Sequence, residues 1–150
     1  MPKMSSHLFL SVLFFLLTLN AGVVLAEMAS VSRDNVNIRS APGMKEQVLW
    51  KLGQGFPLRV LKRSGKWLQV RDFEGESGWI PKSAVSKEGH MVVKVRKKVS
   101  LRSSPSVNSN IVAKAGYGVV LKTLGKRKGW VKVGQGGVTG WVREDLLWGF

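Results

Sequence analysis

The stretch Val36-Asn37-Ile38-Arg39-Ser40-Ala41-Pro42 occurs a second time, in matching residue classes, as Val99-Ser100-Leu101-Arg102-Ser103-Ser104-Pro105. Arg39 and Arg102 lie 63 positions apart. The same offset aligns five further pairs, which are Lys51 and Lys114, Gly53 and Gly116, Gly55 and Gly118, Trp67 and Trp130, and Val70 and Val133. After a one-residue deletion, Gly78-Trp79-Ile80 aligns with Gly140-Trp141-Val142. The chain is therefore a tandem repeat of one small module.

Both copies have the pattern of short β-strands. In the repeated stretch, Val36 and Ile38 are expected on one face of a strand, and Asn37 and Arg39 on the other. Further short apolar runs alternate with Gly-rich turns, and no window has the 3.6-residue apolar period of a helix. We expect Met44 to Val48 to be a loop. The sequence predicts an all-β fold with two tandem small β-barrels, a first domain over 30–87 and a second over 91–150.

Residues 1–26 have the features of a secretory signal peptide. Lys3 precedes a run of about a dozen apolar residues from Leu8 to Leu19, and Val24-Leu25-Ala26 suits a cleavage site. The run is shorter than the ~20 residues of a membrane-spanning helix. We expect cleavage after Ala26, no stable membrane span afterwards, and a secreted or periplasmic protein. The alternative is an uncleaved anchor, in which Ala21 to Ala26 lengthens the apolar span.

The chain is strongly basic, with 24 Lys+Arg, 9 Asp+Glu and a formal net charge of +15. Removal of residues 1–26 takes away only one of these charges, that of Lys3. A charge this large indicates an anionic partner. For an exported protein the candidates are phosphate- or carboxylate-rich wall polymers, lipopolysaccharide and anionic lipid head groups. Nucleic acid is disfavoured because it would require a cytoplasmic protein.

The composition excludes several kinds of catalytic and metal site. The chain has no Cys, so disulfides, thiolate zinc sites and a Cys nucleophile are impossible. Outside residues 1–26 the only histidine is His90, which excludes a zinc site with several His ligands. The acidic group Asp72-Glu74-Glu76 is either a pair of catalytic carboxylates or a solvated hairpin tip. Its counterpart, Gly134-Gln135-Gly136, has no carboxylate, which favours the tip. We therefore predict no enzyme, no cofactor and no metal.

Four motifs follow one another in each copy and together resemble bacterial SH3 domains (SH3b). They are the Val-x-Ile/Leu-Arg-Ser-x-Pro opening, the Gly-x-Gly turn, a basic loop before Trp-x-x-Val, and the closing Gly-Trp-Ile/Val. The resemblance extends from about Ser30 to Phe150. It implies small, partly open SH3-like barrels of exported bacterial proteins, which often bind peptidoglycan or target a partner enzyme to the wall. It also suggests that Arg39 and Arg102 tie a loop to backbone carbonyls or to an acidic group, rather than contacting a ligand. No catalytic domain accompanies the two barrels in this chain, unlike in wall hydrolases.

The candidate ligand-binding residues are two tryptophans and the basic loops before them. Strand alternation places Leu68 and Val131 toward the core, and therefore Trp67 and Trp130 on the opposite face. Six cations precede these tryptophans, namely Lys62, Arg63, Lys66, Lys126, Arg127 and Lys128. An indole stacks on a sugar ring while the cations meet carboxylate or phosphate, so the combination suits an anionic glycan or glycopeptide. The alternatives are that the tryptophans pack beneath the proline loop and that the cations are ordinary turn residues.

These observations lead to two functional hypotheses. The first is a non-enzymatic binding module of the cell envelope, whose ligand is peptidoglycan or another anionic wall polymer. The second is a protein-interaction adaptor that holds a peptide or recruits a partner enzyme of the envelope. Under the first hypothesis, two weak sites joined by a short linker gain avidity.

Overall fold

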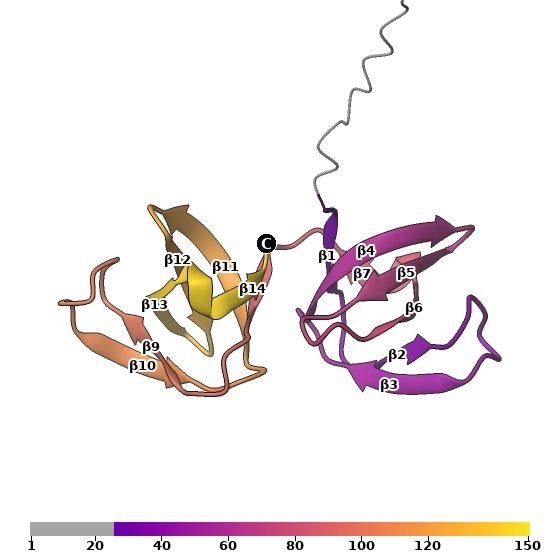
Figure 1. Ribbon diagram of the computed structural model, residues 1–150, viewed down its shortest axis with the longest axis horizontal. Helices are drawn as coiled ribbons and strands as arrows, with labels where there is room; N and C mark the ends of the chain where they lie inside the picture. Colours follow the sequence, from indigo (N-terminus) through magenta and orange to yellow (C-terminus); the bar gives the residue numbers. More distant parts are fainter. Residues whose placement is uncertain (1–25) are drawn as a thin grey trace, which may run out of the picture.

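The computed structural model describes residues 26–150, which form two β-domains, one from each copy (Figure 1). The predicted signal peptide, except for Ala26, lies outside the described residues. The strands of the first domain are β1 (Met28–Val31), β2 (Val36–Arg39), β3 (Val48–Leu52), β4 (Pro57–Ser64), β5 (Trp67–Arg71), β6 (Ser77–Pro81) and β7 (Val85–Ser86). Those of the second are β8 (His90–Val93), β9 (Val99–Arg102), β10 (Ile111–Ala115), β11 (Val120–Arg127), β12 (Trp130–Gln135), β13 (Val138–Arg143) and β14 (Leu147–Gly149).

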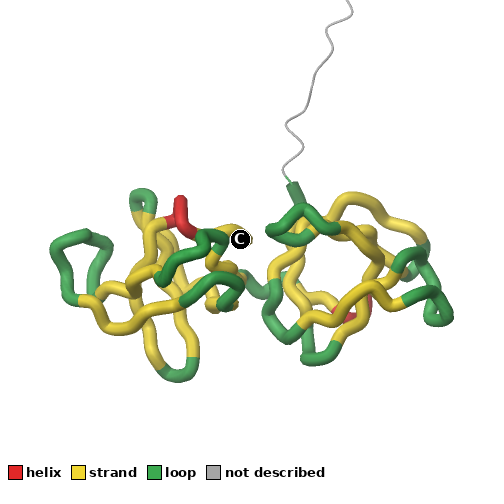
Figure 2. The backbone as a smooth tube through the Cα atoms, turned by 60° about the horizontal axis from the view of Figure 1, so that its bottom comes forward, coloured by secondary structure: helices red, strands yellow, loops and turns green. Residues whose placement is uncertain are grey.

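The two domains have the same topology, which confirms the prediction of two tandem all-β barrels. The strand order is β3-β2-β6-β5-β4-β1-β7 in the first sheet and β10-β9-β13-β12-β11-β8-β14 in the second. Each sheet curls around its own core (Figure 2). The helical segments of the described residues are two 3-10 turns, η1 (Lys82–Ala84) and η2 (Glu144–Leu146). Within residues 26–150 no helix has the length and apolar character needed to cross a membrane.

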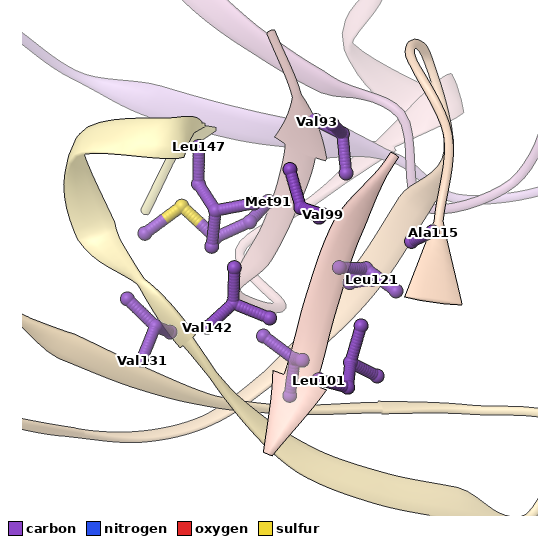
Figure 3. Close-up of a cluster of buried hydrophobic side chains, with 10 residues drawn as sticks. Met91, Val93, Val99, Leu101, Ala115, Leu121, Val131, Val142 and Leu147 are labelled. Atoms are coloured by element: carbon purple, nitrogen blue, oxygen red, sulfur yellow. The ribbon is translucent and has the colours of Figure 1, made fainter. Parts of the chain in front are cut away.

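Each barrel closes around a core of aliphatic side chains. The predicted alternation of the repeated stretch is confirmed, since Val36 and Ile38 are buried while Asn37 and Arg39 are partly exposed. In the second domain the buried side chains of all seven strands pack into one cluster (Figure 3). The side chains labelled in that view are Met91, Val93, Val99, Leu101, Ala115, Leu121, Val131, Val142 and Leu147. A core of this size is close to the minimum for a ~60-residue domain without disulfides or metal.

The closing Gly-Trp motif lies directly against the opening strand of its own domain. A Cβ atom added to Gly78 would lie 2.3 Å from Cγ2 of Ile38 and 3.2 Å from the carbonyl oxygen of Arg39. In the second domain, a Cβ on Gly140 would lie 2.9 Å from Cβ of Leu101. Both separations are shorter than van der Waals contact, so only glycine allows β6 and β13 to approach β2 and β9 this closely. This packing requirement explains why both copies have glycine before the tryptophan.

The structure contains one strand per domain that the sequence did not predict. The region from Met44 to Val48 was expected to be a loop, but Val48 begins β3, and β10 is its counterpart in the second domain. Both are edge strands with a register shift in their pairing to the next strand. A bulge interrupts the two-residue alternation on which strand prediction depends. Leu49 and Val112, at the shifts, are 42% and 46% exposed, so the apolar pattern gives no sign of a buried face.

The two domains contact each other through side chains that differ between the copies. Phe73 lies against Tyr117, with ring centroids 5.3 Å apart, and the Tyr117 hydroxyl donates a hydrogen bond to the Glu74 carboxylate. The guanidinium of Arg96 lies over the Tyr117 ring at 4.5 Å. The prediction that Asp72-Glu74-Glu76 is a solvated tip is wrong for Asp72, which is buried and accepts hydrogen bonds from two backbone N–H groups of the turn at 2.9 Å. Glu74 and Glu76 are exposed, as predicted, and Glu74 also contacts the second domain through Tyr117.

A second group of contacts surrounds the linker. Ser30 donates a hydrogen bond to the carbonyl of Glu88 at 2.7 Å, and its hydroxyl lies 3.2 Å from Nδ1 of His90. The His90 ring covers Gly55, where an added Cβ would lie 2.8 Å from Cδ2 of the imidazole. Farther along, the Arg59 guanidinium lies 5.8 Å from the centre of the Trp148 ring. Together with Tyr117, these contacts hold the two barrels side by side (Figure 1).

We predict that Gly78→Ala and Gly140→Ala each lower the free energy of unfolding by about 1–3 kcal/mol, the usual cost of overpacking a core. The control is Gly116→Ala, where an added Cβ meets no atom within 4 Å and the backbone φ is not positive. Urea unfolding of the three variants measures the difference. Equal stability of Gly140→Ala and Gly116→Ala would contradict the packing role of Gly140.

Tyr117 makes the contact between the domains sensitive to alkaline pH. Its hydrogen bond to Glu74 raises the pKa of the phenol, and desolvation raises this pKa further. The raised pKa means that the folded contact favours the neutral phenol, so its contribution is complete below the ordinary pKa of about 10 and is lost as the pH rises through the folded value. We expect small-angle X-ray scattering to detect separation of the domains in strong alkali.

Tyr117→Phe is the control, because it keeps the ring against Phe73 and Arg96 but has no hydroxyl to ionise, so it should abolish any change in domain arrangement that depends on the phenol in the alkaline range. Tyr117 is the chain's single tyrosine, so ultraviolet absorbance follows its ionisation without interference from other tyrosines. A phenol that titrates at or below its ordinary pKa would refute the contact with Glu74.

Candidate carbohydrate-binding surface

The basic segment before each tryptophan is mostly strand rather than loop. β4 continues to Ser64 and β11 to Arg127, so Lys62, Arg63 and Lys126 lie on strands, contrary to the expected loops. The turns have only two residues, Gly65-Lys66 and Lys128-Gly129. Two-residue hairpin turns that match the strand twist require positive φ. Gly65 supplies it in the first domain with a φ of 54°, and Lys128 and Gly129 in the second with 47° and 82°.

Trp67 and Trp130 are the first residues after these turns, and the structure places them as predicted. Both are partly exposed, while the next residues, Leu68 and Val131, are buried. The two indoles therefore lie on the outer face of the hairpin, away from the core. They are anchored on regular strands, which holds an aromatic platform more rigidly than a loop does.

Trp67 lines a hollow on the surface of the first domain. The hollow has a volume of about 370 Å³ and is lined by Met44, Lys66, Trp67, Pro81, Lys82 and Ser83. Met44, from the proline loop, is 69% exposed. Apolar groups thus line the hollow beside the indole, and two lysines stand at its border. This combination suits a ligand with an apolar or sugar face and some negative charge.

Trp130 lies between two hollows of the second domain. One has a volume of about 220 Å³ and is lined by Trp130 together with Lys97, Lys98, Val99, Ser100, Arg102, Val107, Arg143 and Leu146. The other, of about 290 Å³, is lined by Ser104, Pro105, Arg127, Lys128 and Trp130. The same indole borders both. Basic side chains therefore line both hollows that border the ring.

The structure divides the six predicted cations into two groups. Lys66, Arg127 and Lys128 line the hollows that contain the tryptophans. Arg63 instead pairs with Glu27, and Lys126 with Glu144 at 2.8 Å, at equivalent positions of the two domains. All four partners of these pairs are about half exposed, so the pairs add little stability. Lys62 lies on β4 outside the Trp67 hollow.

Several lining residues were not predicted. They come from parts of the chain distant from the tryptophans, and the main ones are Met44, Pro81, Lys82, Lys97, Lys98, Val107 and Arg143. The repeat alignment could have identified some of these positions, because Val107 aligns with Met44 and Arg143 with Pro81. The same two positions thus line the hollow in both copies. A sequence pattern within one strand cannot reveal them.

The arginine of the opening motif has the structural role that the resemblance suggested. Nη1 of Arg39 donates a hydrogen bond to the carbonyl of Glu46, and Nη1 of Arg102 donates one to the carbonyl of Ser109, both at 2.8 Å. Each bond ties the proline loop to the strand that precedes it. Met44 and Val107 lie within these loops, so the arginines position one wall of each hollow. Arg102 also lines the first hollow beside Trp130.

The acidic and histidine side chains form no metal-binding group within residues 26–150, where no cluster of three or more His, Asp or Glu is close enough to hold an ion. His90 contacts Ser30 and the carbonyl of Glu88 in the joint between the domains, away from both tryptophans. The side chains that line the hollows supply indole rings, aliphatic groups, cations and serine hydroxyls.

Comparison with known families agrees with this architecture. The family described as bacterial SH3 domain matches residues 32–87, and a second family with the same description matches residues 97–147. The chain belongs to the bacterial SH3 domain family. The matched segments correspond to the two barrels, so each is a bacterial SH3 domain, and the proline loop, the basic hairpin and the closing Gly-Trp strand occur in both.

Two curated relatives contain similar sequence. A Bacillus subtilis (strain 168) protein, "Putative N-acetylmuramoyl-L-alanine amidase YrvJ", is 26% identical over 79% of this chain and 25% of its own length. A Staphylococcus epidermidis protein, "Probable cell wall amidase LytH", is 28% identical over 57% of this chain and 28% of its own length. The chain thus spans about a quarter of each relative. Among solved structures, the "Endolysin LysPBC5 CBD" matches 81% of this chain and 92% of its own with 17% identity and a TM-score of 0.33.

We predict that Lys128→Gly raises the free energy of unfolding by about 0.5–1 kcal/mol, because a side chain in the left-handed region is strained and glycine is not. The matched variant is Gly65→Lys, which places lysine at the equivalent turn position of the first domain, where φ is also positive. Thermal unfolding should show opposite shifts for the two variants. If Lys128→Gly instead lowers the unfolding temperature, the lysine contributes contacts that outweigh the strain.

Proposed function

We propose that this protein is a non-enzymatic binding module of the bacterial cell envelope that holds an anionic wall polymer, peptidoglycan in the first place, on the surfaces around Trp67 and Trp130. The observation that carries the proposal is the recurrence of one arrangement in both domains. Each domain has an indole on the outer face of the hairpin, a hollow beside it and at least one cation from the hairpin turn. The protein acts in the envelope after export.

The physical chemistry of the surface supports a glycan ligand. A partly exposed indole offers a flat apolar face to a sugar ring, and the neighbouring ammonium and guanidinium groups pair with carboxylates of the polymer. The net charge of +15 favours the approach of any polyanion. One of the two curated relatives is named as a putative N-acetylmuramoyl-L-alanine amidase and the other as a probable cell wall amidase. The segment that resembles this chain is about a quarter of the length of each relative, as expected if the proteins share only a binding region.

Two domains in one chain increase the strength of binding. Each hollow is open and small, so a single site is expected to be weak. The contacts around Tyr117 and His90 keep the two sites at a fixed separation, and the second site binds at a high effective concentration once the first is occupied. The wall carries many binding units, so both sites can be occupied at once. The arrangement is therefore suited to retention on an insoluble wall.

We predict that Trp67→Ala/Trp130→Ala weakens retention on purified insoluble peptidoglycan by about 10–100-fold, as expected for the loss of two central aromatic contacts. Retention of the unaltered protein should also fall between about 0.05 M and about 0.5 M salt, because exposed charge contacts are screened. The assay is a pull-down at both salt concentrations, with circular dichroism to verify that the variant is folded.

A charge-matched pair of variants separates the hollows from general basicity. Lys66→Ala/Arg127→Ala removes two cations that line the hollows, and Arg63→Ala/Lys126→Ala removes two cations engaged in ion pairs. The first should weaken binding several-fold more than the second. Absence of retention at low salt would refute the proposal and would favour the adaptor hypothesis, which capture of an envelope protein then tests.

A further inference from the structure

The surface around Trp130 differs in charge from its counterpart around Trp67. The repeat alignment compares the two position by position. Six basic side chains line the hollows beside Trp130. Arg102 has the equivalent Arg39 in the first copy and Arg143 pairs with Asp145, whereas the other four have no cation at their equivalent positions. Lys97, Lys98, Arg127 and Lys128 replace Asp34, Asn35, Ser64 and Gly65, respectively. Residues 91–150 accordingly hold twelve Lys+Arg against two Asp+Glu, whereas residues 30–87 hold eleven against five.

These four cations are available to a ligand. All four are exposed, and none takes part in an ion pair among the described residues. They form two pairs that share one aromatic neighbour, because Lys97 and Lys98 border one hollow, Arg127 and Lys128 border the other, and Trp130 borders both. The backbone φ of Lys128 is 47°, in the left-handed region. A residue other than glycine adopts this conformation at a cost in free energy.

Building on the proposed function, we propose that the surface around Trp130 recognises a linear phosphodiester polymer of the cell wall. Two successive phosphates pair with Lys97/Lys98 and with Arg127/Lys128, and the sugar or polyol unit between them lies against the indole. In such a polymer the negative charges lie along the chain at regular intervals. The carboxylates of peptidoglycan lie instead on its peptide branches, so they cannot place charge on both sides of a stacked sugar in the same way.

The first domain has the complementary preference. Beside the indole, its hollow is lined by the uncharged residues Met44, Pro81 and Ser83, and its only cations are Lys66 and Lys82. This lining suits a ligand with less negative charge. The two barrels therefore divide the binding of a composite wall. The first domain holds the glycan or its peptide, and the second holds the attached phosphate polymer.

The test uses the full chain and two variants with equal net charge. The surface variant, Lys97→Asn/Lys98→Asn/Arg127→Ser/Lys128→Gly, gives the second domain residues that match or resemble those of the first. The control, Lys51→Gln/Lys87→Gln/Lys94→Gln/Lys114→Gln, removes four exposed lysines outside the hollows. The soluble probes are poly(glycerol phosphate) and, with the same number of charges, poly-L-glutamate. Isothermal titration calorimetry measures each affinity.

We expect the unaltered protein to bind poly(glycerol phosphate) about tenfold more tightly than polyglutamate, and the surface variant to lose about tenfold on the phosphate polymer. The control variant should lose about threefold or less. Equal affinity of the unaltered protein for both polymers, or equal losses in the two variants, would overturn the proposal. Tighter binding to vesicles that contain phosphatidylglycerol would overturn it too, by assigning the surface to a lipid head group.

Retention on peptidoglycan from which the attached polymers have been removed tests the proposed function separately from the phosphate assignment, which rests on it. If the protein is retained on the stripped wall but ignores poly(glycerol phosphate), only the phosphate assignment fails. If it binds the phosphate polymer but not the stripped wall, peptidoglycan is not its ligand and the surface around Trp130 stands alone. The surface variant should lose less affinity for stripped wall than for poly(glycerol phosphate), because the Trp67 hollow is unchanged.

Discussion

Both barrels depend on the close crossing of the closing strand over the opening strand. Gly78 rests on Ile38, and Gly140 on Leu101, at separations that leave no room for a side chain. The approach brings Trp79 opposite Arg39 and Trp141 opposite Arg102 in the sheet. Each arginine then holds a proline loop, and that loop supplies one wall of the hollow beside Trp67 or Trp130. A contact in the core thus sets the shape of a surface some distance away.

The sequence predicts what depends on alternation along a strand, and much less of what depends on distant residues. Val36, Ile38 and Val131 were placed correctly because apolar and polar residues alternate around them. The strands β3 and β10 were missed because a bulge breaks that alternation at an exposed sheet edge. The tryptophans of the candidate site were identified, but the wall formed by Met44 and Val107 was not. Its position follows from how the proline loop folds back, which no local pattern encodes.

The two copies share the residues that build the barrel and differ in those that meet other groups. Leu68 and Val131 are both core residues beside an outward indole. Ser64 and Arg127 occupy the same position of the hairpin in the two copies but differ in charge. A fold that tolerates change on its hairpin turns allows the two surfaces to be altered independently. The repeat therefore combines one architecture with two surfaces of different charge.

The joint between the domains has a direction. It pairs the β5–β6 tip of the first copy, with Phe73 and Glu74, to Tyr117 in the Gly-x-Gly turn of the second. The second copy has Gly136 and Gly137 at the tip, and the first has Gln54 in the turn. A third module with a tyrosine in its turn would find no aromatic or carboxylate receptor on the second. The contact through Tyr117 is therefore specific to these two modules and fixes their order along the chain.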